Sequence, residues 1–140
     1  MAALLGAGGL IPFLAGSGYL CLGPVLYAQV VSNALIGYGA VILAFLGAVH
    51  WGLYLTVAQE DSLRLVLGIT PSLIGWGALL LALLGAPVLG LVLLILGFLG
   101  IFLVDWQTVK QGLIPAWYGR LRLRLSLVVL PSLVLAGLSF

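Results

Sequence analysis

The sequence predicts an all-α integral membrane protein, a bundle of five transmembrane helices with a cytoplasmic N-terminus and a C-terminus outside. Hydrophobic residues make up 64% of the 140 residues and charged residues only 6%, against roughly a quarter in an ordinary soluble domain. Apolar runs of about 20 residues, the length that crosses a bilayer, follow one another with short breaks. The charged residues gather in only two of those breaks and the adjoining helix ends. We therefore expect a single transmembrane domain over residues 1–140.

The first two predicted spans cover residues 2–22 and 34–58. The first has no charge, and a Gly-Pro pair ends it because proline cannot continue a helix. Pro12 lies near its middle, where neighbouring helices can satisfy the carbonyl that proline leaves free. The second span ends at a polar Gln-Glu-Asp-Ser turn. A helix bend is expected at Pro12.

The remaining predicted spans cover residues 63–84, 88–104 and 121–139. Pro71 and Pro131 lie inside the third and the fifth span, so two further bends are expected there. All three prolines lie in helices that run outward from the cytoplasm. We expect the three bends to surround a common central feature.

Residues 105–120 form the longest polar segment of the chain. Tryptophan and tyrosine alternate there with basic side chains, which is typical of an aromatic belt beside lipid phosphates. We expect this segment to lie on the membrane surface and to contact lipid headgroups.

All eight formal charges lie on one side of the membrane if there are five spans. The opposite side then has no lysine or arginine, and the positive-inside rule makes the charged side cytoplasmic. The charged residues are Glu60, Asp61, Arg64, Asp105, Lys110, Arg120, Arg122 and Arg124.

Small residues recur at four-residue spacing on the second predicted span. Such a stripe lets another helix backbone approach closely, so we expect a helix-packing face. The stripe consists of Ala40, Ala44, Ala48 and Gly52.

His50 is the only histidine and lies deep within a predicted span. An ionisable group at that depth costs free energy unless it faces other helices or water, so a functional site is the default hypothesis. Trp51, Tyr54 and Trp76 are candidates to line a pathway or ligand pocket with it. The alternative is a neutral histidine that bonds a carbonyl or a tyrosine and holds helices together.

Asp105 closes the fourth predicted span, near the negative end of that helix dipole, and needs cations nearby. Arg120 and Arg124 share a helix face and are expected to form a polar cytoplasmic mouth with it. Arg122 points the other way. A structural salt bridge and a role in handling protons or substrate are both open for Asp105, and the arginines also suit lipid phosphates.

Several classes of function are not expected. No predicted span contains paired carboxylates, and the chain has no second histidine, P-loop or dinucleotide motif, so neither catalysis nor a metal site is predicted. Nucleic-acid binding is not expected either, because the few basic residues lie near the ends of predicted spans, where such residues set the topology. No cofactor is expected, although a bound lipid or quinone stays open.

Several motifs resemble the domain-of-unknown-function 3429 family, the transmembrane protein 69-like small polytopic membrane proteins. They are Phe45-Leu46-Gly47-Ala48-Val49-His50-Trp51-Gly52 after Tyr38-Gly39-Ala40, then Pro71-Ser72-Leu73, Asp105, and Pro115-Ala116-Trp117-Tyr118 followed by Arg120-Leu121-Arg122-Leu123. The resemblance implies a multi-pass protein of a bacterial inner membrane, or of the mitochondrial inner membrane in a eukaryote. It implies no particular activity, cofactor or catalytic residue.

Three functions are open on the sequence alone. The first is a channel or transporter subunit for protons or small solutes, built around His50. The second is an accessory or assembly subunit of a larger, bioenergetic membrane complex, with a partner protein or a second copy of this chain. The third is a lipid or quinone pocket in which His50 bonds the polar head.

Overall fold

The computed structural model describes residues 1–140 and contains helices without any strand. Five helical segments are long and apolar enough to span a membrane, which confirms the predicted all-α class and the number of spans. The elements are α1 (Ala2–Gly8), α2 (Ile11–Leu22), the 3-10 turn η1 (Val25–Tyr27), α3 (Ala28–Thr56), α4 (Leu63–Leu83), α5 (Pro87–Lys110) and α6 (Ala116–Leu138).

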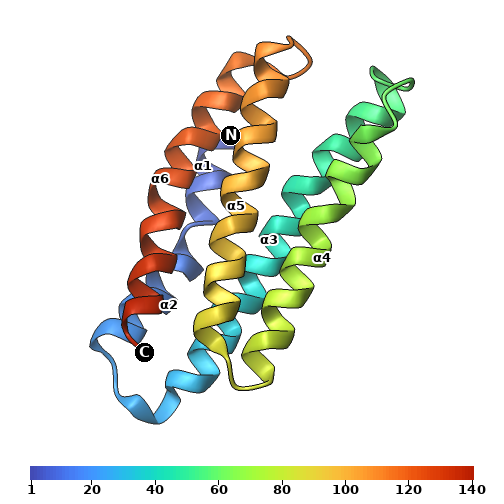
Figure 1. Ribbon diagram of the computed structural model, residues 1–140. Helices are drawn as coiled ribbons and strands as arrows, with labels where there is room; N and C mark the ends of the chain where they lie inside the picture. Colours follow the sequence, from blue (N-terminus) through green and yellow to red (C-terminus); the bar gives the residue numbers. More distant parts are fainter.

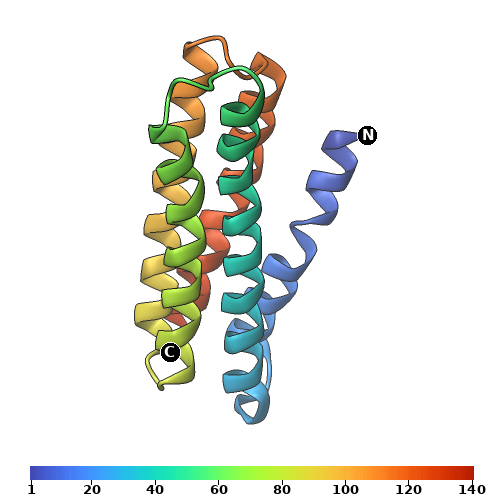
Figure 2. The same cartoon turned by 90° about the vertical axis from the view of Figure 1, so that its right-hand side faces the viewer.

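The helices run alternately up and down, and α3, α4, α5 and α6 form the body of the bundle (Figure 1). Helices α1 and α2 together make the first span, and α1 leans away from α3 in the view of Figure 2. The core between the helices is apolar and includes Phe13, whose ring meets those of Tyr38 and Phe98 edge to face. This aromatic group attaches the first span to α3 and α5.

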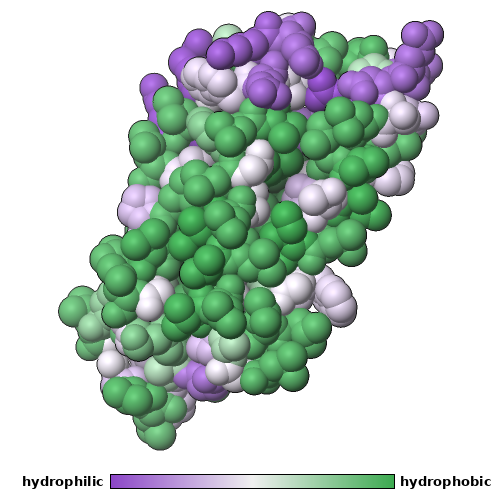
Figure 3. Space-filling model, viewed as in Figure 1, coloured by the Kyte–Doolittle hydropathy of each residue, from purple (hydrophilic) through white to green (hydrophobic).

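The loops between α3 and α4 and between α5 and α6 lie at the same end of the bundle (Figure 1). Hydrophilic residues gather at that end, and the sides of the molecule are hydrophobic (Figure 3). We call it the charged end. The chain turns at the other end through Gly85, whose φ of 89° favours glycine.

The boundaries of three helices differ from the prediction. Helix α3 begins at Ala28 instead of residue 34, and α5 continues through Asp105 to Lys110. Helix α6 already begins at Ala116. Residues 105–120 are therefore two helix ends and a short turn, not an extended surface segment. The physical reason is that Asp105 and Thr108 face inward, where side chains of other helices satisfy their polar groups.

The three prolines do not surround a common feature. The chain breaks between α1 and α2 just before Pro12, whereas α4 and α6 continue through Pro71 and Pro131 as single helices. Pro71 is buried, but Pro131 is exposed. The expected shared centre is therefore wrong, because the helix turn places Pro131 on the outer face of α6.

Helices α3 and α4 pack backbone against backbone at glycines. A Cβ atom added at Gly47 would collide with the carbonyl of Gly68, and one added at Gly75 would lie 2.9 Å from Cα of Ala40. The close contacts thus recur every seven residues on both helices.

The predicted four-residue stripe is only partly used in this contact. Ala40 takes part, and Ala44 is half-buried, but Ala48 and Gly52 are exposed and Gly52 has open space around it. Helices that cross at a small angle meet at a spacing of about 3.5 residues, so a stripe with strict spacing of four drifts out of the contact.

Candidate functional site

Four ionisable side chains from four helices meet inside the charged end of the bundle. His50 of α3, Arg64 of α4, Asp105 of α5 and Arg122 of α6 are each at most 5% exposed. His50 lies six residues before the end of α3 at Thr56, a depth of about 9 Å at 1.5 Å per residue. We call these four residues the buried ionic cluster.

Asp105 is the centre of this cluster. Its Oδ1 lies 2.9 Å from Nε2 of His50, and its Oδ2 accepts a hydrogen bond of 2.7 Å from Nε of Arg122. One carboxylate therefore joins α3, α5 and α6. Both of its oxygens have a partner, which offsets part of the cost of burying the charge.

Arg64 completes the cluster from the side of the loop between α3 and α4. One terminal nitrogen, Nη1, donates to Oγ1 of Thr108 at 2.8 Å and to Nδ1 of His50 at 3.2 Å. The other, Nη2, donates to Oε1 of Gln111 at 2.7 Å. Its Nε lies 3.3 Å from Oδ2 of Asp61, whose side chain is 47% exposed. Arg64 thereby links the buried cluster to the solvent-facing turn.

The partners of His50 define its protonation state in this structure. A guanidinium has only donors, so Nδ1 of His50 accepts from Arg64 and carries no proton. The proton is then on Nε2 and is donated to Asp105. His50 is neutral, and both of its ring nitrogens are engaged by protein groups.

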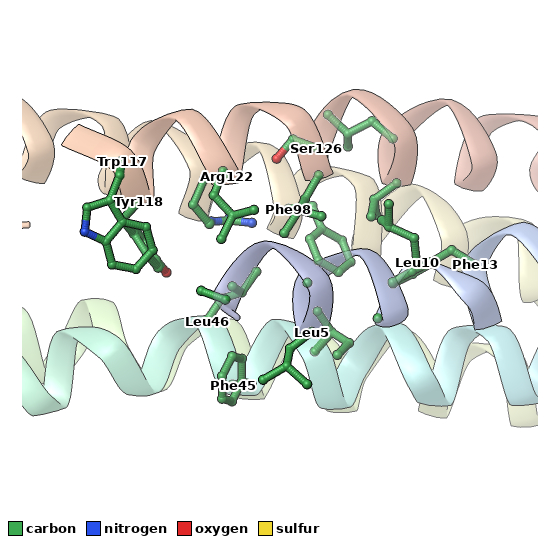
Figure 4. Close-up of a pocket in the computed structure, with 18 residues that line it drawn as sticks. Leu5, Leu10, Phe13, Phe45, Leu46, Phe98, Trp117, Tyr118, Arg122 and Ser126 are labelled. Carbon is green, nitrogen blue, oxygen red and sulfur yellow. The ribbon is translucent and has the colours of Figure 1, made fainter. Parts of the chain in front are cut away.

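A cavity of about 380 Å³ lies beside the cluster, between the first span, α3 and α6, with Phe98 contributed by α5. Fourteen of its 18 lining residues are hydrophobic, so its walls favour an apolar occupant. Figure 4 shows Trp117 and Tyr118 at one end of the cavity and Leu10 and Phe13 at the other.

Arg122 belongs to both the cluster and the cavity wall. It uses only Nε toward Asp105, and its Nη2 is buried without a hydrogen-bond partner. Figure 4 shows the guanidinium end of Arg122 among the lining side chains, with the hydroxyl of Ser126 farther along the same helix. A buried donor without an acceptor is costly, so this position is suited to a ligand that supplies one.

The structure separates the other residues predicted around His50. Trp51 is 42% exposed and donates from Nε1 to the carbonyl of Leu65 at 3.1 Å. Trp76 is 65% exposed, Tyr54 is half-buried, and neither lines the cavity. The expected pocket of these aromatic residues is therefore wrong, because Trp51 and Trp76 are exposed on the outside of the bundle, and Tyr54, one helix turn after His50, does not line the cavity.

The structure also changes which arginine pairs with Asp105. Arg120 and Arg124 are exposed, and Arg122 makes the contact. The expected mouth of Asp105 with Arg120 and Arg124 is wrong because α6 turns these two outward. The sequence held a signal for Arg122 in the spacing of residues along α6. Arg122 falls on the helix face of Gly119, Ser126, Val129, Leu133 and Ala136, which follow one another every three or four residues, and the structure buries all six.

Three polar partners were not predicted as site residues. Arg64 was expected only as one of the charges that set the topology, and Thr108 and Gln111 only as part of the predicted surface segment 105–120. Thr108 lies three residues after Asp105 and hence on the same face of α5, a spacing that could have suggested it. Its hydroxyl accepts from Arg64 and donates to the carbonyl of Val104 at 2.7 Å.

The fold and the cluster together define a polytopic α-helical membrane protein with a buried ionic centre at one end. The chain matches the family described as "Protein of unknown function (DUF3429)" over residues 1–138 and belongs to it. It is also similar to the protein named transmembrane protein 69 of Xenopus tropicalis, with 35% identity over 133 residues, which cover 93% of this chain.

The chain spans about half the length, 51%, of that curated relative. No solved structure matches the chain. The comparisons thus support a multi-pass membrane protein of this family.

Proposed function

We propose that this protein binds a membrane amphiphile in the cavity between the first span, α3 and α6. The observation that carries the proposal is the position of Arg122, whose buried Nη2 has no acceptor while the residue lines an apolar cavity. The polar head of the ligand accepts from Arg122, and its chain lies along the apolar walls. A lipid or a quinone has this chemistry.

The cavity supports this proposal by its size and its walls. Its volume of about 380 Å³ lies within the range of ligand pockets, roughly 300–1,000 Å³. Trp117 and Tyr118 lie at one end of the cavity (Figure 4), in the first turn of α6 and hence next to the loop between α5 and α6. Such amphipathic rings favour the level of lipid headgroups. A ligand head near Arg122 and a tail toward Phe13 would match the polarity of the surroundings.

His50 acts in this proposal as a positioning residue. It holds one oxygen of Asp105, and Asp105 in turn orients Arg122. Both ring nitrogens of His50 are occupied by protein partners, and His50 does not line the cavity. This arrangement favours ligand binding over a solute pathway through His50. The sequence also predicts transport, an accessory role in a larger complex and a homo-oligomer, and these three remain predictions.

The test uses the fluorescence of Trp117, which lines the cavity. The purified full chain in a mild detergent is titrated with dibromostearate and with the matching dibrominated alcohol. Both are brominated at the carbons next to the head, so that the bromine atoms lie on the side of the cavity where Trp117 is and quench it on contact. We expect saturable quenching by at least one of them, competition by the bromine-free compound, and loss of that signal in Trp117→Phe.

Two leucine substitutions, one inside the cavity and one outside it, test whether the quenching comes from the cavity. Ser126 lines the cavity, so Ser126→Leu should fill it and abolish the saturable quenching. Ala48 is exposed on α3, so Ala48→Leu adds the same side chain outside the cavity and should leave the quenching unchanged. Quenching that is only linear in the probe, or equal in the two variants, would contradict ligand binding.

We also propose that the charged end is cytoplasmic, with the N-terminus inside and the C-terminus outside, in a bacterial inner membrane or its mitochondrial counterpart. The basic side chains at that end support this orientation. Cys21 is the only cysteine and lies near Ser139 at the other end. An impermeant thiol reagent added to cells with a permeabilised outer membrane should label Cys21, but not Gln59→Cys in a Cys21→Ser background. The reverse pattern would overturn the orientation.

A further inference from the structure

We infer that the headgroup of the ligand in this cavity is acidic, a carboxylate or a phosphate that binds Arg122. This inference rests on the proposed function and specifies its ligand class. It starts from the charges that the fold buries beside the cavity.

The buried ionic cluster lacks one negative charge. Arg64 and Arg122 each carry a positive charge, Asp105 carries the only negative one, and the hydrogen bonds of His50 require it to be neutral. Asp61 contacts Arg64 at 3.3 Å, but its side chain is 47% exposed and lies outside the buried cluster, so it offsets the charge of Arg64 only in part. Burial of an uncompensated charge is costly, so an additional anion at this place would be stabilising.

Of the two arginines, Arg122 is the one that can bind that anion. Arg64 already donates to Thr108, His50 and Gln111. Arg122 makes its one hydrogen bond through Nε, which leaves both terminal nitrogens for a ligand. Only Arg122 of the two lines the cavity.

The geometry of a guanidinium favours an acid over a neutral head. A carboxylate or phosphate presents two oxygens that match two N–H groups of arginine, and such charge-assisted bonds are about twice as strong as neutral ones. A quinone carbonyl or an alcohol presents one neutral acceptor and leaves the cluster one charge short. The hydroxyl of Ser126, which lines the same cavity, is a further donor for the second oxygen of an acid.

The experiment compares heads on the same brominated chain. Dibromostearate, the dibrominated alcohol, and phosphatidic acid and phosphatidylcholine with dibrominated chains are each titrated against the quenching of Trp117. We expect the acids to bind at least about tenfold more tightly than the alcohol, since the bonds to Arg122 are charge-assisted. A preference for dibromostearate identifies a free fatty acid as the source, and a preference for phosphatidic acid identifies a phospholipid.

Variants assign the preference to Arg122. Removal of Arg122 alone would leave Oδ2 of Asp105 without a partner and its charge without the arginine that pairs with it, so we use the double variant Arg122→Gln/Asp105→Asn, which removes both charges together. It should bind the acid and the alcohol within about twofold of each other, since the charge-assisted bonds are gone. Arg124→Gln is the matched control, because it removes an exposed arginine two residues away and should keep the preference.

The outcomes separate the inference from the proposed function. If no probe quenches Trp117 saturably, the proposed function fails. If acid and alcohol quench with equal affinity in the unmodified chain, ligand binding stands and the acidic headgroup is wrong. Loss of the preference in Arg124→Gln would also overturn the inference, because the preference would then come from the surface charge.

Discussion

The two sides of α3 are packed in opposite ways. On the side of α4, the backbones meet at Gly47 and Gly68 with no room for an added Cβ. On the side of the first span, α1 contains no buried residue and a cavity of about 380 Å³ separates α3 from α6. Helix α3 is thus held in place by its close contact with α4, and a cavity can lie on its other side without a shift of α3.

The buried ionic cluster lies where the two sides meet. His50 is on α3 between Arg64 of α4 and Asp105 of α5, and Arg122 extends the contacts to the cavity wall. The close contact of α3 with α4 therefore fixes the position of His50, and His50 in turn fixes Asp105. Asp105 then orients the side chain of Arg122. Three of the following predictions change one part of this arrangement at a time, and the last changes the surface beyond it.

The largest effect is expected from Asp105→Ala. This change leaves the donors of His50 and Arg122 without their acceptor, and the loss of one partner of a buried ion pair costs about 3–5 kcal/mol. The free energy of unfolding in detergent mixtures measures it. Asp61→Ala is the control, because its side chain is 47% exposed and such a pair contributes under about 1 kcal/mol. Similar losses in both variants would show that the cluster does not join the two sides.

Gly47→Leu should have the next largest effect. A leucine at this position meets the backbone of Gly68 and the ring of Pro71, so α3 and α4 must separate, at a cost of about 3 kcal/mol. Gly52→Leu is the matched control on the same helix, since no atom outside its own helix lies within 4 Å of an added Cβ. The midpoint of unfolding should fall only in Gly47→Leu. An equal fall of the unfolding midpoint in both variants would contradict a close backbone contact between α3 and α4 at Gly47.

Ser126→Leu should change stability little, although it adds the same side chain inside the bundle. The cavity offers space, and contact of the added carbons with its apolar walls offsets the lost hydroxyl, so we expect a change within about 1 kcal/mol. The unfolding measurement used for Gly47→Leu applies here too. A destabilisation as large as that of Gly47→Leu would mean that the second side of α3 is not hollow.

The sequence alone predicts the five spans because composition and run length determine them without knowledge of any contact. It also marks His50 and Asp105 as polar groups in apolar helices. It does not predict their pairing, because a contact between α3 and α5 depends on the register of two helices that are far apart in the chain.

The choice among the arginines failed for a related reason. Arg122 lies on the opposite helix face from Arg120 and Arg124, so the three positions alone do not show which face is buried. The face of Arg122 continues through Ser126 and Val129, which are buried in the structure. The glycine contact of α3 with α4 was missed because a spacing of four was considered and the real contact recurs after seven residues.

The smallest effect is expected from Arg120→Gln and Arg124→Gln, which test the outer surface of the charged end. Both side chains are exposed, so in uncharged detergent each change should alter the free energy of unfolding by less than about 0.5 kcal/mol. In bilayers with anionic lipids, a basic residue near the surface contributes about 1 kcal/mol to the attraction, and each variant should lose a similar amount of lipid-dependent stability. Unfolding in mixed micelles with and without phosphatidylglycerol measures the difference. A large loss in uncharged detergent would show that these arginines belong to the buried network, and the distinction between Arg122 and its two neighbours would fail.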